Sequence, residues 1–152
     1  MSLQFEPMTD GAVTIRPPRD GDAAVIVASR DAEFHRWMGP GADHPQPTAC
    51  IEVEGEVVGW VDYDQDGDRH WLGPGEVNVG YHVFAEHRGK GYATRAVELL
   101  VRYLAAATDH HTATLLIDRD NARSLAVARR AGFVRRGDVR SSILFERPVD
   151  TP

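Results

Sequence analysis

Residues 76–94 read EVNVGYHVFAEHRGKGYAT and run from a strand through a glycine turn into a helix. From Glu76 to Phe84, apolar residues alternate with polar ones, which is the period of a strand with one apolar face. From Gly91 onward the apolar residues recur every three to four positions, as in an amphipathic helix. Successive main-chain N–H groups that enter a helix bind anions, and the helix dipole favours this. The stretch therefore predicts a phosphate-binding turn between a strand and a helix.

The segments on either side of this turn alternate between the same two periods. Single helices between strands predict an α/β (α+β) domain, with a mixed, mostly antiparallel sheet of six to seven strands and helices on both faces. The domain is expected over 13–148, after a flexible N-terminal segment, 1–12. In chain order we expect a strand at 13–16, a helix at 23–28 capped by Asp20 or Asp22, a helix at 32–38, strands at 49–53, 57–62 and 76–84, a helix from Gly91 through 104, a strand at 112–117, a helix capped by Asp120 or Asn121 that ends at Gly132, and strands at 133–139 and 142–145.

Length and composition limit the classes of protein to which the chain can belong. Its 152 residues suffice for one domain with a core of its own and are too few for two. No apolar run approaches the roughly 20 residues of a membrane span, and residues 1–10 lack a signal-peptide pattern. Cys50 is the single cysteine, which excludes an intrachain disulfide. We therefore expect a soluble, cytoplasmic protein.

The charge of the chain is unevenly distributed. A net charge of −6 argues against general nucleic-acid binding, which needs a basic surface. Residues 1–85 hold 5 Arg and 15 Asp/Glu, whereas residues 86–152 hold 12 Lys/Arg and 8 Asp/Glu. A basic half suits a phosphate-bearing cofactor and an acidic half suits a cationic substrate. Two solvated faces are the simpler explanation of the same asymmetry.

The glycine turn by itself is compatible with several functions. A P-loop needs a longer glycine spacing followed by Gly-Lys-Ser/Thr, and Gly89-Lys90-Gly91 does not provide it. A dinucleotide fingerprint needs a third glycine where Thr94 stands, and it needs parallel strands where the preceding ones read as antiparallel. A turn without a ligand remains possible on these residues alone.

Two motifs at a characteristic spacing resemble those of the GNAT superfamily, the acyl-CoA-dependent N-acetyltransferases. One motif is a phosphate loop of the form Gln/Arg-x-x-Gly-x-Gly/Ala, and the other is an Asn that opens a helix ending in Gly-Phe. The extended segments 80–100 and 121–133 look most like the branch of ribosomal-protein alanine N-acetyltransferases. The matching residues are Arg88, Gly91 and Ala93 in the first motif, and Asn121, Ser124, Gly132 and Phe133 in the second.

The resemblance implies a GNAT fold with a cofactor cleft between splayed strands, acetyl-CoA as co-substrate, and no metal. The main-chain amides of 88–94 would hold the pyrophosphate, and the end of the strand would pair its backbone with the pantetheine arm. One N–H at the strand end would polarise the thioester carbonyl. The cofactor-binding residues so implied are His82, Val83, Phe84, Arg88, Gly89, Lys90, Gly91, Tyr92, Ala93, Thr94, Asn121 and Ser124.

The implied reaction is direct acetyl transfer to a primary amine, which needs a neutral amine and a proton for the leaving thiolate. Many relatives carry a tyrosine acid seven residues after the Asn, and here Ala128 stands there. Ser124 is then the candidate acid or water anchor. Several relatives carry a Glu where this chain has Asn78, which can only orient a substrate or water.

Three residues are candidate bases. His82 shares a strand face with Asn78 and titrates near neutrality. Glu76 at the start of that strand and Asp62 on the preceding strand are the others, although solvated carboxylates are the simpler interpretation of both. The predicted catalytic residues are His82, Ser124, Asn78 and Glu76.

The expected acceptor is a small cationic amine or a peptide N-terminus, with no nucleic-acid or membrane partner and a possible homodimer. A non-catalytic acyl-CoA-binding or regulatory module of the same fold is the alternative, and a nucleotide-binding module is a third. Residues 62–68 match the first half of a calcium loop, but Gly73 stands at its last ligand position. The histidines show no metal-binding spacing, so we expect no metal site.

Overall fold

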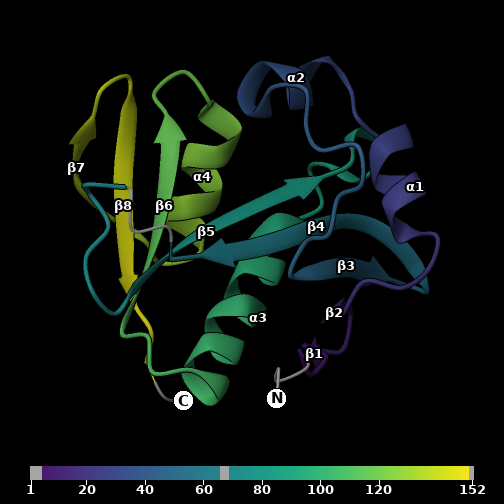
Figure 1. Ribbon diagram of the computed structural model, residues 1–152, viewed down its shortest axis with the longest axis horizontal. Helices are drawn as coiled ribbons and strands as arrows, with labels where there is room; N and C mark the ends of the chain where they lie inside the picture. Colours follow the sequence, from purple (N-terminus) through teal and green to yellow (C-terminus); the bar gives the residue numbers. More distant parts are fainter. Residues whose placement is uncertain (1–4, 66–68, 151–152) are drawn as a thin grey trace.

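The computed structural model describes residues 5–65 and 69–150, and within them the chain forms one eight-stranded sheet and four α-helices (Figure 1). The predicted calcium half-motif extends over 66–68 and so falls partly outside the described residues. The elements are β1 (Met8–Thr9), β2 (Val13–Arg16), α1 (Asp22–Ala28), α2 (Ala32–Met38), β3 (Ala49–Val53), β4 (Glu56–Asp64), β5 (Glu76–Val83), a 3-10 turn (Ala85–His87), α3 (Tyr92–Ala107), β6 (Thr112–Asp118), α4 (Ala122–Arg130), β7 (Val134–Val139) and β8 (Ser142–Pro148).

The sheet has the order β1-β2-β3-β4-β5-β6-β8-β7. Its strand pairs are antiparallel except for β5 and β6, which run parallel and are connected through α3. The prediction of six to seven strands was wrong because it missed the short strand β1, in which Met8 pairs with Ile15 of β2. The ordered sheet therefore begins before residue 13, where the domain was expected to start. Asp10 ties this segment to α3 through a 2.6 Å ion pair with Arg95.

The two central strands separate partway along their length. β5 and β6 pair only from Glu76–Thr112 to Asn78–Thr114. Beyond that point β6 stays paired with β8 as far as Asp118, while β5 runs on to Val83 beside β4 (Figure 1). Within the described residues, one edge of β5 from Val79 to Val83 therefore has no neighbouring strand, as the expected splayed cleft requires.

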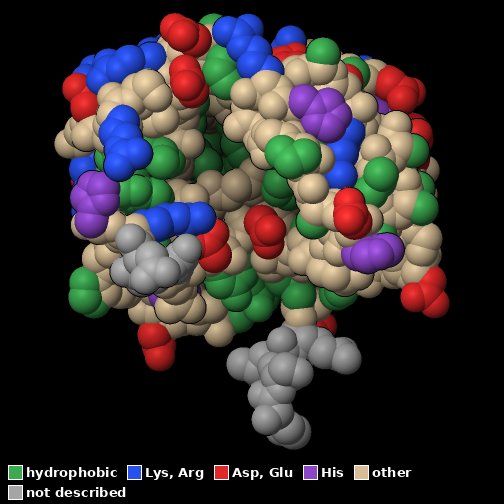
Figure 2. All heavy atoms as spheres, turned by 45° about the horizontal axis from the view of Figure 1, so that its top comes forward, with side chains coloured by type: hydrophobic (Ala, Val, Ile, Leu, Met, Phe, Trp, Pro, Cys, Tyr) green, Lys and Arg blue, Asp and Glu red, His purple; other side chains and the backbone are tan. Residues whose placement is uncertain are grey.

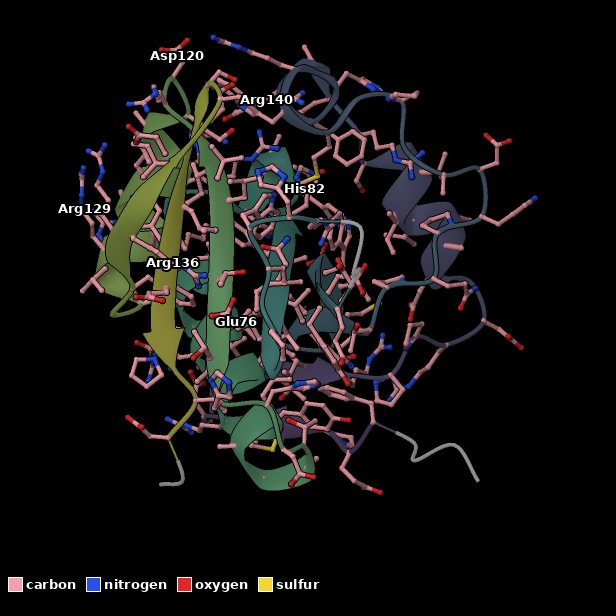
Figure 3. The ribbon with its side chains drawn as sticks, turned by 60° about the vertical axis from the view of Figure 1, so that its left-hand side comes forward. Glu76, His82, Asp120, Arg129, Arg136 and Arg140 are labelled. Atoms are coloured by element: carbon pink, nitrogen blue, oxygen red, sulfur yellow. The ribbon has the colours of Figure 1, made fainter. Side chains whose placement is uncertain are left out.

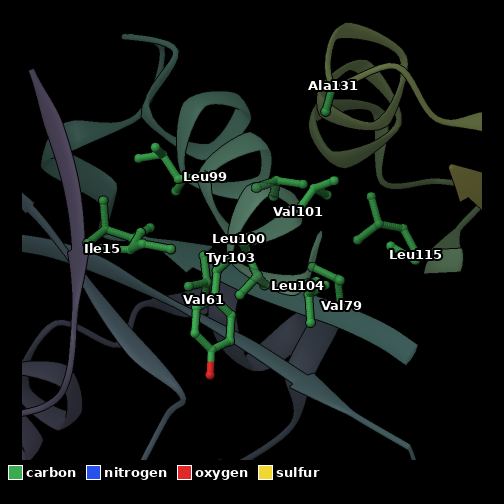
Figure 4. Close-up of a cluster of buried hydrophobic side chains, with 14 of the residues drawn as sticks. Ile15, Val61, Val79, Leu99, Leu100, Val101, Tyr103, Leu104, Leu115 and Ala131 are labelled. Carbon is green, nitrogen blue, oxygen red and sulfur yellow. The ribbon is translucent and has the colours of Figure 1, made fainter. Parts of the chain in front are cut away.

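Both faces of the sheet are covered by helices. On one face α3 buries Leu100 and Leu104 completely against sheet residues such as Val61 (Figure 4). On the other face Ile26 of α1 packs with Phe84 in a second, smaller cluster. Because successive residues of a strand point to opposite faces, neighbouring side chains of β5 reach different layers.

Helix ends follow the sequence at α4 and depart from it at α1. Asn121 caps α4, and its side chain accepts the N–H of Ser124 at 3.2 Å. The helix α1 instead begins after Gly21 and has no side-chain cap. Asp22 was expected to cap α1, but its carboxylate is buried and pairs with Arg16 at 2.8 Å. None of the helices in the described ranges has the length and apolar composition of a bilayer crossing.

Candidate functional site

The glycine turn before α3 leaves a row of main-chain N–H groups without partners. Gly89 and Gly91 have φ angles of +78° and +81°, which favour glycine because other residues are strained there. The helix α3 has no side-chain cap and no acidic residue in its first turn. Within the described residues, the N–H groups of 92–94 have no acceptor. Such a helix end binds anions.

This turn opens onto a cleft of about 460 Å³ between α4 and α2. Figure 2 shows the molecule hollowed between its two halves. Arg123 and Arg130 add positive charge to the wall, whereas Arg129 points outward from α4 (Figure 3). The predicted site residues that line the cleft are His82, Val83, Arg88, Gly89, Gly91, Tyr92, Ala93, Thr94, Asn121 and Ser124.

Four predicted site residues do not line the cleft. Phe84 is buried in the cluster beneath α1, and the exposed Lys90 lies outside the wall. Asn78 accepts a 3.1 Å hydrogen bond from Thr114 where β5 and β6 still pair. Glu76 lies near the end of β5 remote from His82 (Figure 3) and pairs with Arg136 at 2.7 Å. Asn78 and Glu76 are therefore structural residues at the paired end of the strands.

The ion pair also sets the protonation of Glu76. Burial acts to raise the pKa of this carboxyl, but the hydrogen bond from Arg136 and the N–H of Gly73 outweigh burial and lower it. A carboxylate with a lowered pKa is a weaker base. The position and the pKa of Glu76 therefore both disfavour the expected catalytic role.

The alternation of hydrogen-bonded positions along β5 decides which of its main-chain groups face the cleft. Phe84 N–H donates to Val58 O at 2.9 Å, and Trp60 is opposite His82 in the register. In an antiparallel pair the bonded positions alternate, so His82 and Phe84 bond to β4 while Tyr81 and Val83 point toward the gap. The N–H groups of His82 and Phe84 are therefore engaged with β4 and do not face the gap. The main-chain groups that face the gap are those of Val83, which the resemblance implied, and those of Tyr81, which it did not.

The side chain of Arg88 turns away from the anion-binding turn. It donates to Val83 O at 3.0 Å and to Asp31 at 2.7 Å, and it lies 3.1 Å from Glu33. The hydrogen bond from Arg88 holds the pKa of the Asp31 carboxyl well below its ordinary value. Arg88 therefore links the glycine turn to α2, and its main-chain N–H already donates to Ala85 O at 3.4 Å, so the free N–H groups of the turn lie after it.

A hydroxyl pair occupies the α4 side of the cleft. The phenol of Tyr81 hydrogen-bonds the Ser124 hydroxyl. Burial raises the pKa of Tyr81 to about 12, although the bond with Ser124 acts in the opposite direction. The strand pattern in the sequence placed Tyr81 on the apolar face, and no role in the site was predicted for it. The strand period could have marked it, but the contact with α4 depends on tertiary packing.

His82 points to the other face of the sheet, into an aromatic environment. Its ring lies 4.9 Å from Phe34, 6.1 Å from Trp60 and 6.0 Å from Phe84, measured between ring centroids. The side chain is buried, and Nε2 has no hydrogen-bond partner among the described residues. Burial, followed by the nearby charge of Arg88, lowers the pKa of His82 to about 4. The imidazole is therefore neutral at physiological pH.

A second cavity of about 250 Å³ adjoins the cleft. Phe34 and Met38 of α2 line both spaces, so the two are neighbours. Arg30, the loop 41–47 and two residues of β4, Trp60 and Asp62, provide the rest of its wall. The side chain of Asp62 accepts the N–H and the hydroxyl of Thr48 at 2.9 and 2.6 Å.

A family model described as the acetyltransferase (GNAT) domain matches residues 12–134. The chain therefore belongs to the GNAT acetyltransferase family. The resemblance inferred from the two motifs is thus confirmed at the level of the family.

Two curated relatives match part of the chain. It is 32% identical over 100 residues to the imidazolonepropionase of Micrococcus luteus, across 64% of the chain and 23% of that protein. It is 25% identical over 97 residues to the spermidine N(1)-acetyltransferase of Escherichia coli K12, across 64% of the chain and 50% of that protein. The matched regions thus span half or less of these relatives.

Solved structures share the fold across nearly the whole chain. The aminoglycoside acetyltransferase AAC(6')-Ib in complex with coenzyme A superposes with a TM-score of 0.79 at 20% identity, covering 90% of this chain and 95% of that one. RimJ of Mycobacterium smegmatis in complex with CoA-disulfide gives 0.73 at 23% identity, covering 94% and 86%. Identities this low establish the fold alone.

Proposed function

We propose that the protein transfers an acetyl group from acetyl-CoA directly to a primary amine. The observation that carries the proposal is the unpaired edge of β5, which leads into the uncapped N-terminus of α3 along one continuous cleft. Membership of the family and the coenzyme A complexes of two fold neighbours support it. The donor is acetyl-CoA, which supplies an activated acetyl group when bound.

The residues of the cleft fit the parts of this co-substrate. The free N–H groups at the start of α3 suit a pyrophosphate, and Arg130 adds charge for an outer phosphate. The main-chain groups of Tyr81 and Val83 suit the amides of a pantetheine arm, since they face the gap between the strands. Arg88 Nε already occupies Val83 O, which leaves the Val83 N–H for a carbonyl oxygen.

The two faces of β5 divide the chemistry. On the α4 face, the protonated Tyr81 with Ser124 donates a hydrogen bond to the sulfur as negative charge develops there. On the opposite face, neutral His82 borders both the cleft and the aromatic wall of the second cavity. A pKa of about 4 makes His82 a weak base, which is a poor proton acceptor at neutral pH. We therefore propose that His82 orients the amine and does not act as the base that accepts the amine proton.

The second cavity is the proposed acceptor site. A spermidine acetyltransferase among the relatives and a fold neighbour bound to kanamycin support an amine acceptor. The volume of about 250 Å³ is below the roughly 300–1,000 Å³ of typical drug-sized ligand sites, which favours a compact amine or the end of a peptide. The RimJ neighbour is compatible with the peptide alternative that the motif resemblance suggested.

The alternative of a non-catalytic acyl-CoA-binding module rested on the replacement of the family tyrosine by Ala128 and of a family glutamate by Asn78. That alanine is fully buried, and the Tyr81–Ser124 pair places hydroxyls in the cleft from other positions. An assay of thiol release from acetyl-CoA with a panel of primary amines separates the two functions. We expect amine-dependent release. Binding of coenzyme A without release for any amine would identify the module instead.

A further inference from the structure

The second cavity has a cation and a carboxylate in its wall, Arg30 and Asp62. From this arrangement we infer that the acetyl acceptor is a compact zwitterionic amine, which carries an anionic group such as a carboxylate in addition to its reacting amine. The inference rests on the proposed function, because it specifies the substrate of the same site. It separates this chain from relatives named for polyamines and from neighbours bound to aminoglycosides.

The guanidinium of Arg30 is held in place by its surroundings. Its Nη2 donates to Ala42 O at 2.8 Å, and its Cζ lies 5.0 Å from the ring centroid of Phe34. Gly41 leaves room for it, because a Cβ at that position would lie 2.6 Å from Cζ. A positively charged group fixed in this way loses little conformational entropy when it binds a ligand.

The charge of Arg30 has no carboxylate partner in the described part of the chain. Its hydrogen bonds within the described residues go to the main-chain carbonyls of Pro40 and Ala42, and its buried Nε has no acceptor there. Arg16, Arg88 and Arg136 are instead each paired with carboxylates. A fork of N–H groups with an unbalanced charge matches the geometry of a carboxylate or phosphate.

Among the described residues, Asp62 provides the one carboxylate in the wall of the cavity. Both contacts from Thr48 go to Oδ1, and Oδ2 has no partner within the described residues. Trp60, which is also in the wall, offers an aromatic face of the kind that ammonium groups favour. One carboxylate suits one ammonium. Further positive charges on a polyamine or aminoglycoside would approach Arg30 unfavourably.

Between these charges the wall is apolar. Met38, Pro45, Pro47 and the rings of Phe34 and Trp60 provide it. The cavity thus combines one cationic group, one anionic group and an apolar interior, in a volume suited to a small ligand. An amino acid with an apolar side chain, or a short peptide with both termini near each other, has this chemistry.

The test compares acids with their amides as acceptors. Thiol release from acetyl-CoA is measured with leucine, methionine and phenylalanine, with the carboxamide of each, and with spermidine and kanamycin. The wild-type chain is compared with Arg30→Gln and Arg30→Lys, and with Arg36→Gln as a control that removes a charge from an exposed position on α2 outside both cavities.

We expect the wild-type chain to prefer the acids over their amides and over both polycations. Arg30→Gln should raise KM for the acids about 10- to 100-fold, the worth of one or two hydrogen bonds to a charged group, and change KM for the amides less than twofold. Arg30→Lys should keep part of the preference, and Arg36→Gln all of it. Because each acceptor is compared across variants, differences in amine basicity cancel.

Two results would overturn the inference for different reasons. If acids and amides react equally, or if Arg30→Gln impairs both alike, the acceptor needs no anion although the chain is still an N-acetyltransferase. If no amine releases thiol while coenzyme A still binds in calorimetry, the proposed function itself is wrong. Preferred acetylation of spermidine or kanamycin would likewise refute the zwitterionic acceptor.

Discussion

The two sides of the cleft are built differently. The groups proposed to bind the cofactor are chiefly main-chain N–H groups, at the start of α3 and along the edge of β5. The acceptor side consists of side chains from α2, the loop 41–47 and β4, which are distant in sequence. A site made of local backbone leaves a motif in the sequence, whereas a site made of distant side chains does not. The contrast predicts that substitutions on the two sides will have separable effects.

The largest expected effect is on the main-chain side. Replacing Gly89 and Gly91 together with valine forces a β-branched residue into a left-handed backbone at both positions and displaces the N–H groups. Loss of two or more hydrogen bonds to a charged ligand should weaken coenzyme A binding about 1,000-fold, as measured by calorimetry. Gly55→Val has a similar φ of +79° in the hairpin between β3 and β4 and serves as the control. If Gly55→Val weakens binding as much, the loss is not caused by displacement of the N–H groups in the glycine turn before α3.

On the side-chain side, His82 should make stability depend on pH. Its folded-state pKa of about 4 lies below the ordinary value of about 6.5, so the unfolded chain binds more protons between these values. The free energy of unfolding should therefore rise by roughly 3 kcal/mol from pH 4 to pH 6.5 and then level off. Urea titrations across this range should show a shallower rise for His82→Gln than for the exposed control His35→Gln. Equal slopes for both variants would contradict a buried neutral imidazole.

Tyr81 lies at the border between the two sides and should affect turnover without affecting binding. Tyr81→Phe removes the hydroxyl next to Ser124 and should lower kcat about 100-fold, the lower end of proton-transfer effects. Its affinity for coenzyme A should stay within twofold. Tyr63→Phe, a tyrosine of β4 outside both cavities, is the control. An unchanged kcat in Tyr81→Phe would remove the hydroxyl pair from the mechanism.

The smallest effect is expected where the two sides are joined. Arg88→Gln breaks the ion pair with Asp31 and should lower the free energy of unfolding by about 1 kcal/mol at pH 7. Because the pKa of Asp31 is lowered in the folded chain, this contribution is present above about pH 4 and is lost as the pH falls. Thermal unfolding at pH 7 and pH 3 measures the difference. Arg119→Gln, in an exposed pair with Asp138, should change little at either pH.

The same contrast explains what could be predicted from the sequence. Strand and helix periods located the elements from β2 to β8 within a few residues, because each period reflects which face is buried. The short strand β1 was missed, since two residues cannot show a period and β1 depends on pairing with β2. Gly89 and Gly91 stood out because no other residue adopts their backbone readily.

The candidate catalytic residues were harder to predict. Glu76 was proposed from its strand position and Asn78 from the family resemblance, but the sequence does not show that Arg136 and Thr114 bind them. Tyr81 was missed because its partner Ser124 lies on another element. The role of Arg30 depends on its contact with Ala42, a loop residue twelve positions further along the chain. Each of these facts concerns tertiary contacts, which periods and motifs do not specify.

The most direct test of the account is calorimetric titration of the unmodified chain with coenzyme A and, separately, with pantetheine, which lacks the pyrophosphate. If the free N–H groups before α3 bind that pyrophosphate, coenzyme A should bind at one site per chain and pantetheine at least 100-fold more weakly. Equal affinity for the two ligands, or no heat with coenzyme A, would contradict the central claim.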